Sequence, residues 1–190
     1  MTFRFRWLFL AALFIASCGF LHAQDGDVNG LAVTVKKSGQ TVIVDASMSI
    51  NATPREVWDV FTDFDHMAEF SPILQSSKVV ARDGDTMRVE QTGRVRYGLL
   101  SFSYESVRDV VLSPTHEIRS VSAGGSLKSG EATTRLTADG AGTRIAYHSE
   151  SVPKNWVPPG FGVREIEKQT RAQFEGVRNE ILKRKNGAVR

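Results

Sequence analysis

Apolar side chains recur at steps of three and four near the C-terminal end of the chain, over residues 162–185. This spacing places them in one stripe along an amphipathic helix. Charged residues occupy the other faces, and Lys183, Arg184 and Lys185 complement the negative end of the helix dipole. The stripe consists of Val163, Ile166, Thr170, Phe174, Val177 and Ile181. A single long helix of this kind must lay its stripe against another element.

Before this helix the pattern changes to alternation, which is typical of half-buried strands. In residues 41–50, for example, Val42 and Val44 alternate with Ile43 and Asp45. Asp-Gly pairs at 83–84 and 139–140 predict hairpin turns, and the glycine-rich segment 124–130 predicts a loop. The expected strands are residues 31–35, 41–50, 77–82, 86–97, 100–112, 117–123, 131–138 and 143–152.

A capping box marks the start of a short helix after the early strands. Thr53 takes the N-cap position, Pro54 the first helical position and Glu56 the third. Three apolar residues of this helix are expected to point inward: Val57, Trp58 and Phe61. A second helical turn is expected over residues 66–70. The chain therefore predicts an α+β fold: a curved antiparallel sheet of about seven strands around the C-terminal helix, with two short helices after the first strand.

The first residues have the features of an export signal. Arg4 and Arg6 precede an apolar segment, 7–16, which is too short to span a bilayer. Cleavage after Ala23 gives an ordinary signal peptide of residues 1–23, whereas a lipobox-like sequence gives a leader of residues 1–17 and a lipidated Cys18. Both alternatives predict export to a bacterial periplasm, the second as a membrane-anchored lipoprotein. Residues 24–30 are expected to form a tether, 31–186 the folded domain and 187–190 a tail.

Composition excludes several classes of site. The formal charge is +3, and without the two leader arginines 22 basic residues face 21 acidic ones, which leaves no electrostatic footprint for nucleic acid. Cys18 is the one cysteine, so the domain has no disulfide. His66, His116 and His148 do not have metal-ligand spacing, and we therefore expect neither a metal nor another cofactor.

Two segments resemble a known superfamily. Residues 51–64 read NATPREVWDVFTDF, and residues 67–72 read MAEFSP, followed by a serine pair at 76–77. They resemble the START-like (SRPBCC) superfamily, and within it the polyketide cyclase/dehydrase and coenzyme Q-binding group. Met67 stands where an aromatic residue is usual, and Ser71 where leucine is frequent. Over residues 31–185 the resemblance implies a helix-grip fold with an apolar cavity between the sheet and the long helix. Members bind lipids, quinones, sterols or polyketides, and a minority are cyclases or dehydratases.

Such a cavity would be lined by aromatic side chains and a few polar groups, in about 300–1,000 Å³. The candidate ligand-binding residues are Gln91, Tyr97, Phe102, Tyr104, Tyr147, Trp156, Phe161, Thr170 and Phe174. The alternative for each aromatic residue is solid core. For Gln91 and Thr170, which interrupt apolar faces, the alternative is an internal hydrogen bond. Trp156 either gates the cavity mouth or packs on the helix.

Three functions follow, in this order of preference. The first is an exported carrier of a hydrophobic small molecule such as a lipid, an isoprenoid quinone or a polyketide-like compound. The second is an interaction module, anchored at the membrane through Cys18, that recruits a protein partner. The third is a cyclase or dehydratase with an acid or base such as Tyr104, His148 or Glu150 in the cavity. We assign no catalytic residue, because no convergent set of such groups is evident.

Overall fold

The computed structural model describes residues 30–97, 100–154 and 162–188, and the side chains of residues 95–97 and 100 lie outside that description. The predicted leader, Cys18 and most of the tether lie outside the described residues. The elements are β1 (Leu31–Ser38), β2 (Thr41–Ile50), α1 (Pro54–Phe61), the 3₁₀ turn η1 (Phe64–His66), α2 (Met67–Phe70), β3 (Leu74–Asp83), β4 (Thr86–Tyr97), β5 (Leu100–Ser113), β6 (Glu117–Gly125), β7 (Leu127–Asp139), β8 (Gly142–Pro153) and α3 (Val163–Gly187).

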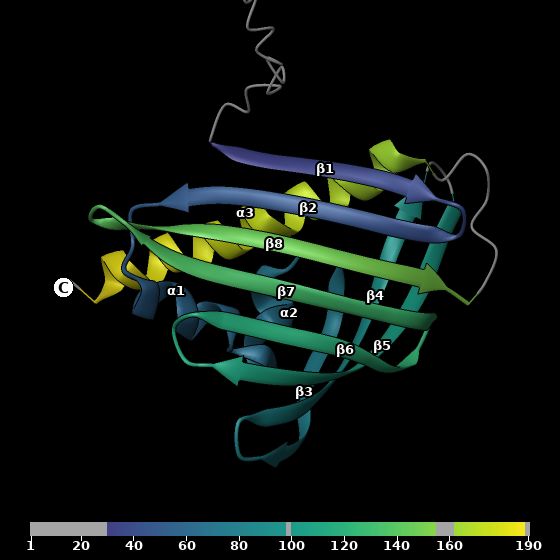
Figure 1. Cartoon of the computed structure of the whole chain (residues 1–190), viewed down its shortest axis with the longest axis horizontal. Coiled ribbons are helices and arrows are strands. Elements are labelled where there is room, and N and C mark those ends of the chain that lie inside the picture. The colour runs from purple at the N-terminus through teal and green to yellow at the C-terminus, as the bar shows by residue number, and fades with distance from the viewer. Residues whose placement is uncertain (1–29, 98–99, 155–161, 189–190) are drawn as a thin grey trace, which may run out of the picture.

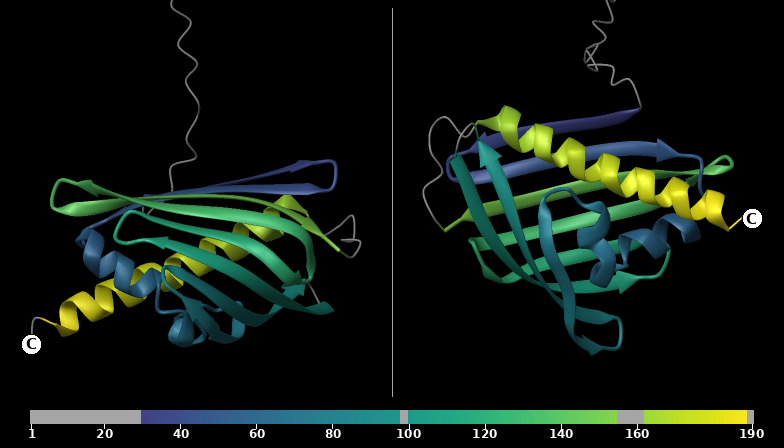
Figure 2. Two further views of the ribbon diagram at one scale, coloured as in Figure 1. Left: turned by 60° about the horizontal axis from the view of Figure 1, so that its bottom comes forward. Right: turned by 180° about the vertical axis from the view of Figure 1, so that it is seen from behind.

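All strands belong to one antiparallel sheet with the order β1-β2-β8-β7-β6-β5-β4-β3 (Figure 1). The sheet curves, and α3 lies across its inner face together with α1 and α2 (Figure 2). The predicted α+β architecture is confirmed. The sheet has eight strands, and they correspond to the eight expected segments. One detail of the prediction was wrong: the short helices follow the second strand and not the first. β1 and β2 pair as an antiparallel hairpin, and α1 begins after the second strand of this hairpin.

The predicted loop over residues 124–130 was also wrong. β6 continues to Gly125, and β7 begins two residues later at Leu127. Gly125 has a φ of 85°, which allows the tight reversal. Ser126 then continues the hydrogen bonding to β5: its N–H donates to the carbonyl of Glu105, and its hydroxyl accepts from the N–H of Glu105. Backbone pairing thus overrides the local tendency of glycine to form a loop.

The core lies between the inner face of the sheet and the helices. Alternate residues of β2 are buried, as the pattern predicted, and so are Phe174, Val177 and Ile181 of the α3 stripe. Towards the N-terminal end of α3, Val163 and Ile166 are only half-buried and pack against the edge of the core. The apolar stripe is therefore buried more deeply at Phe174, Val177 and Ile181 than at its N-terminal end.

The capping box of α1 is formed as predicted. The Thr53 hydroxyl accepts from the N–H of Glu56 at 3.3 Å, and the Glu56 carboxylate accepts from the N–H of Thr53 at 2.7 Å. These bonds satisfy two backbone donors that the start of a helix leaves free. The cap fixes where α1 begins and so places Trp58 and Val57 in the core.

Close backbone contact holds α3 against α2. A Cβ on Gly176 would overlap the carbonyl oxygen of Phe70 and come within 3.3 Å of Pro72. At the C-terminal end, Arg184 donates to Asp63 and to Glu180, both at 2.8 Å. The helix is therefore fixed to the α1–α2 region by steric fit and by an ion-pair network.

We expect Gly176→Ala to destabilise the protein, although alanine is favoured over glycine inside a helix by about 1 kcal/mol. The new methyl group must move α3 away from Phe70, which breaks core contacts on the same helix. Urea unfolding checks this. The control is Gly187→Ala at the end of α3, where a Cβ meets nothing within 4 Å. Equal stability of the two variants would contradict the close approach.

Removal of the Asp63 carboxylate should produce a pH-dependent loss of stability. Burial raises the pKa of Asp63, but hydrogen bonds from His66 and Arg184 outweigh it and bring the pKa below its ordinary value of 3.8. Its contribution is therefore present above pH 3.8 and is lost as the pH falls through the lowered pKa. The hydrogen bond to Asp63 raises the pKa of His66 above 6.5, so that contribution is present below pH 6.5 and is lost as the pH rises through the raised pKa.

We expect Asp63→Asn to lower the free energy of unfolding by about 1 kcal/mol near pH 6, because the pair with Arg184 is only partly shielded from solvent. The difference from the wild type should shrink below pH 3.8 and, in part, above pH 6.5. Urea unfolding across that pH range measures it. Asp109→Asn, which removes an exposed cross-strand pair with Arg88, should cost less. A pH-independent difference would show that Asp63 acts through packing alone.

Candidate functional site

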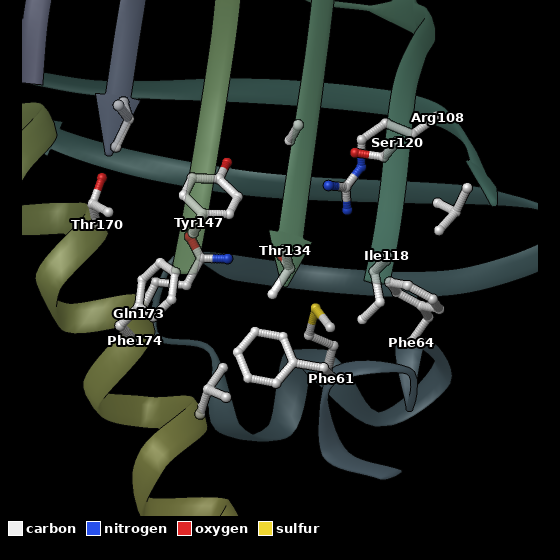
Figure 3. Close-up of a pocket in the computed structure, with 15 residues that line it drawn as sticks. Phe61, Phe64, Arg108, Ile118, Ser120, Thr134, Tyr147, Thr170, Gln173 and Phe174 are labelled. Atoms are coloured by element: carbon white, nitrogen blue, oxygen red, sulfur yellow. The ribbon is translucent and has the colours of Figure 1, made fainter. Parts of the chain in front are cut away.

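A hollow of about 140 Å³ lies between α3, the short helices and the inner face of the sheet (Figure 3). Its apolar wall is formed by Val44, Phe61, Phe64, Met67, Val110, Ile118, Ala132, Phe174 and Val177. Its polar wall is formed by Arg108, Ser120, Thr134, Tyr147, Thr170 and Gln173. These residues come from α1, η1 and α2, from α3 and from five strands, so the complete fold is needed to build the site.

Three aromatic rings limit the size of this hollow. Phe174 on α3 contacts Phe61 on α1 with ring centroids 6.4 Å apart, and it meets Tyr147 on β8 edge-on at 5.5 Å. Such tilted pairs are favoured by the charge distribution of aromatic rings. Because the rings occupy much of the space under α3, the hollow is smaller than the expected range of about 300–1,000 Å³. The expectation of a lipid-sized space was wrong for this hollow.

A second hollow, of about 170 Å³, adjoins the first. The two share Arg108, Ser120, Ala132 and Tyr147 as lining residues. Serines dominate the rest of its wall: Ser106, Ser122, Ser149 and Ser151. It lies where β6 and β7 separate, since their pairing ends at Val121 and Glu131. A third hollow, of about 410 Å³, borders the same gap and includes Glu131 and Glu150 in its lining.

Arg108 stands at the junction of the first two hollows. It projects from β5 into the cavity, opposite Val89 of β4, and one of its terminal nitrogens donates to the side-chain oxygen of Gln91. The Nε atom of Arg108 is shielded from solvent and has no hydrogen-bond partner. Burial lowers the pKa of Arg108, while Tyr147 and Tyr104 nearby act in the opposite direction. Arginine nevertheless stays charged in proteins, so the site contains a cation.

Gln91 accepts a hydrogen bond from this cation and is itself fixed by two neighbours. Its amide nitrogen donates to the hydroxyl of Ser77 at 2.9 Å and approaches the sulfur of Met67 at 3.4 Å, which leaves its oxygen to accept from Arg108. Gln91 is 6% exposed and does not line the hollow under α3. The internal hydrogen bond considered as its alternative role is therefore formed.

The structure brings together three of the predicted ligand-binding residues. Tyr147, Thr170 and Phe174 line the hollow under α3. The Thr170 hydroxyl donates to the carbonyl of Ile166 at 2.9 Å, so its hydrogen is used within the helix. The predicted roles of Trp156 and Phe161 fall outside the described residues.

The remaining candidates lie elsewhere. Phe102 is 37% exposed and does not line either inner hollow, and neither does Tyr104. The Tyr104 ring lies over Gly93, in the space that a Cβ on this glycine would occupy. The side chain of Tyr97 lies outside the described part of the chain. A structural role therefore accounts for the position of Tyr104.

The acid and base candidates do not converge. Burial raises the pKa of Tyr104 to about 12, with Arg108 acting in the opposite direction, so this phenol stays protonated near neutral pH. His148 is exposed, and its Nδ1 atom pairs with Asp45 on the neighbouring strand at 2.7 Å. Its Nε2 atom lies 3.5 Å from Glu150, so these two side chains lie on one face of the sheet. Neither lines the hollow under α3.

Arg108 is the charged site residue that the sequence prediction missed, and the polar lining residues Ser120, Thr134 and Gln173 were missed as well. Alternation along residues 100–112 predicted one face that includes Phe102, Tyr104, Val110 and Leu112. Alternate residues of a strand share a face, so Arg108 lies on the same face as these apolar residues. A charged residue on an otherwise apolar face could have indicated a site residue. In the described part of the chain, no three His, Cys, Asp or Glu side chains are grouped as metal ligands, and no helix is long and apolar enough to span a membrane.

A family model described as "Polyketide cyclase / dehydrase and lipid transport" matches residues 41–185. The chain belongs to this family. Among curated proteins, no sequence matches it. The predicted resemblance to the polyketide cyclase/dehydrase group is thereby confirmed, whereas the coenzyme Q-binding group stays a prediction.

Solved structures share the fold of this family member. A STAR-related lipid transfer protein from Xanthomonas axonopodis has a TM-score of 0.70 and 11% identity, over 82% of this chain and 96% of that one. A START superfamily protein from Mycobacterium smegmatis has a TM-score of 0.63 and 12% identity, over 74% and 97%. The Zhui aromatase/cyclase from a Streptomyces species has a TM-score of 0.60 and 16% identity, over 76% and 95%. At these identities the likeness shows the helix-grip fold alone.

Proposed function

We propose that this protein is an exported carrier that binds a hydrophobic small molecule between the sheet and α3 and does not transform it. The observation that carries the proposal is the hollow under α3, whose wall is mainly apolar and aromatic and includes a few polar groups. Small-molecule sites have this composition. Membership of a family whose description includes lipid transport supports the same function.

The lining of the hollow favours carriage over catalysis. The described side chains that line it include no histidine, carboxylate, lysine or thiol. These groups are the ones that most often act as general acids and bases. The cyclase alternative is supported by structural neighbours such as the Zhui aromatase/cyclase, but the described lining of the hollow lacks such a group.

The carrier function predicts that filling the hollow abolishes ligand binding. Ala132 lines both inner hollows from β7, so Ala132→Phe places a ring where the ligand would lie. Native mass spectrometry of the purified wild-type protein should show an apolar adduct, and occupancy in Ala132→Phe should fall by about tenfold or more, since binding there would require a cavity that no longer exists.

The matched control is Ala146→Phe, because Ala146 on the adjacent strand β8 is exposed and lines neither inner hollow. It should keep the wild-type adduct. Circular dichroism of both variants verifies that the fold is retained. An adduct that persists unchanged in Ala132→Phe would place the ligand outside the hollow and contradict the proposal.

Export predicts a specific mass for the mature protein. The arginine-bearing apolar leader supports cleavage, either after Ala23 or before Cys18. The intact mass of protein recovered from a periplasmic or membrane fraction should therefore correspond to a chain that starts at Gln24 or at a lipid-modified Cys18. Recovery of the chain with Met1 to Ala16 still attached, in the cytoplasmic fraction, would refute export.

A further inference from the structure

Arg108 differs in its partners from Arg184, which is also partly buried. Arg184 pairs with two carboxylates, Asp63 and Glu180, whereas Arg108 has a single neutral partner, Gln91. Within the described residues no carboxylate forms a salt bridge with Arg108. The described part of the chain therefore holds a cation at its cavity and places no carboxylate against it.

A charge in this position is costly unless it is paired. Guanidinium has five N–H donors, and Gln91 accepts from one terminal nitrogen. The Nε–H group is buried and unused, so it has neither a protein acceptor nor bulk water. Arg108 lines the hollow under α3, and no described carboxylate pairs with it, so a ligand in the hollow that carries an anionic acceptor would meet an unpaired cation.

The surroundings of Arg108 fix its orientation. The Gln91 amide is itself held by Ser77 and Met67, so it anchors one corner of the guanidinium without neutralising it. The two terminal nitrogens keep N–H groups that do not donate to Gln91, and the paired terminal N–H groups of a guanidinium can bind two oxygens of a carboxylate or phosphate together. An oxyanion is therefore the natural partner.

The two inner hollows define the rest of the ligand. The hollow under α3 has about 140 Å³, and an engineered apolar cavity of about 150 Å³ binds benzene. It therefore holds an apolar group of about one ring. The second hollow offers serine hydroxyls, but Glu131 and Glu150 also border it and would repel an anion. The charged end of the ligand is thus placed beside Arg108, at the junction of the two hollows.

We propose that the ligand is a compact apolar acid, whose ring or short chain fills the hollow under α3 and whose oxyanion pairs with the Arg108 guanidinium. This inference rests on the proposed carrier function and narrows its ligand to one chemical class. The oxyanion is a carboxylate or a phosphate monoester, since both fit the same fork.

The test compares an acid with its neutral analogue. Isothermal titration calorimetry of the full mature chain near neutral pH uses 4-phenylbutanoate, 4-phenylbutanamide and phenyl phosphate as probes. Wild-type protein should bind 4-phenylbutanoate about tenfold to a hundredfold more tightly than the amide, because a charge-assisted pair replaces an unpaired cation. Tighter binding of phenyl phosphate than of 4-phenylbutanoate would identify the oxyanion as a phosphate, and the reverse as a carboxylate.

Variants then assign the preference to Arg108. Arg108→Gln should bind the acid no better than the amide, whereas Arg108→Lys should keep a reduced preference, since it retains the charge but not the fork. The control is Arg144→Gln. Arg144 is an exposed residue of β8 that lines neither inner hollow, so this variant should bind the probes as the wild type does. If Arg108→Gln does not fold, the wild-type comparison and Arg108→Lys still decide.

The outcomes separate this inference from the carrier function. Equal affinity of wild-type protein for acid and amide would overturn the acidic ligand and leave the carrier function standing. Preference for the acid that survives in Arg108→Gln would also overturn it, because the oxyanion would then bind elsewhere. Failure of all three probes to bind would overturn the compact ligand class, and the adduct seen by native mass spectrometry would then decide the carrier function independently.

Discussion

The attachment of α3 to the rim of the sheet is the constraint on which the rest of the structure depends. The close backbone neighbours of α3 are β1, α1 and α2. Arg171 donates to the carbonyl of Leu31 at 3.0 Å on one side, and Gly176 meets Phe70 on the other. A helix supported at its two flanks spans the concave face between them. Space under α3 thus follows from how the helix is held, and side chains decide how much of it remains open.

Much of this architecture follows from local rules that the sequence displays. The Thr53–Glu56 capping box, the Asp-Gly hairpin turns and the α3 stripe each depend on residues close together in the chain, and each formed as predicted. Segment 124–130 was mispredicted as a loop because its structure depends on pairing between distant residues, such as Ser126 with Glu105. Local propensity does not contain that information.

The site was less predictable than the fold for a related reason. Alternation identified which face of each strand points inward, but it could not show which inward residues are covered by neighbours and which border open space. Gln91 and Arg108 lie on inner faces of adjacent strands; the first is enclosed by Ser77 and Met67, and the second reaches the hollow. Likewise, the size of the hollow depends on how Phe61, Tyr147 and Phe174 tilt against one another, which is a property of packing.

The two ends of the apolar stripe on α3 differ in burial, and this difference affects which end of the helix opens more easily. Phe174, Val177 and Ile181 are buried, and Arg184 adds an ion-pair network at that end, whereas Val163 and Ile166 are half-buried. Segments with fewer buried contacts open at lower free energy than the core does. Thr170 and Gln173 line the hollow at the boundary between these two regions of the helix. Under the proposed carrier function, we therefore expect a ligand to enter by displacement of the N-terminal turns of α3, while Phe174, Val177 and Ile181 stay packed in the core.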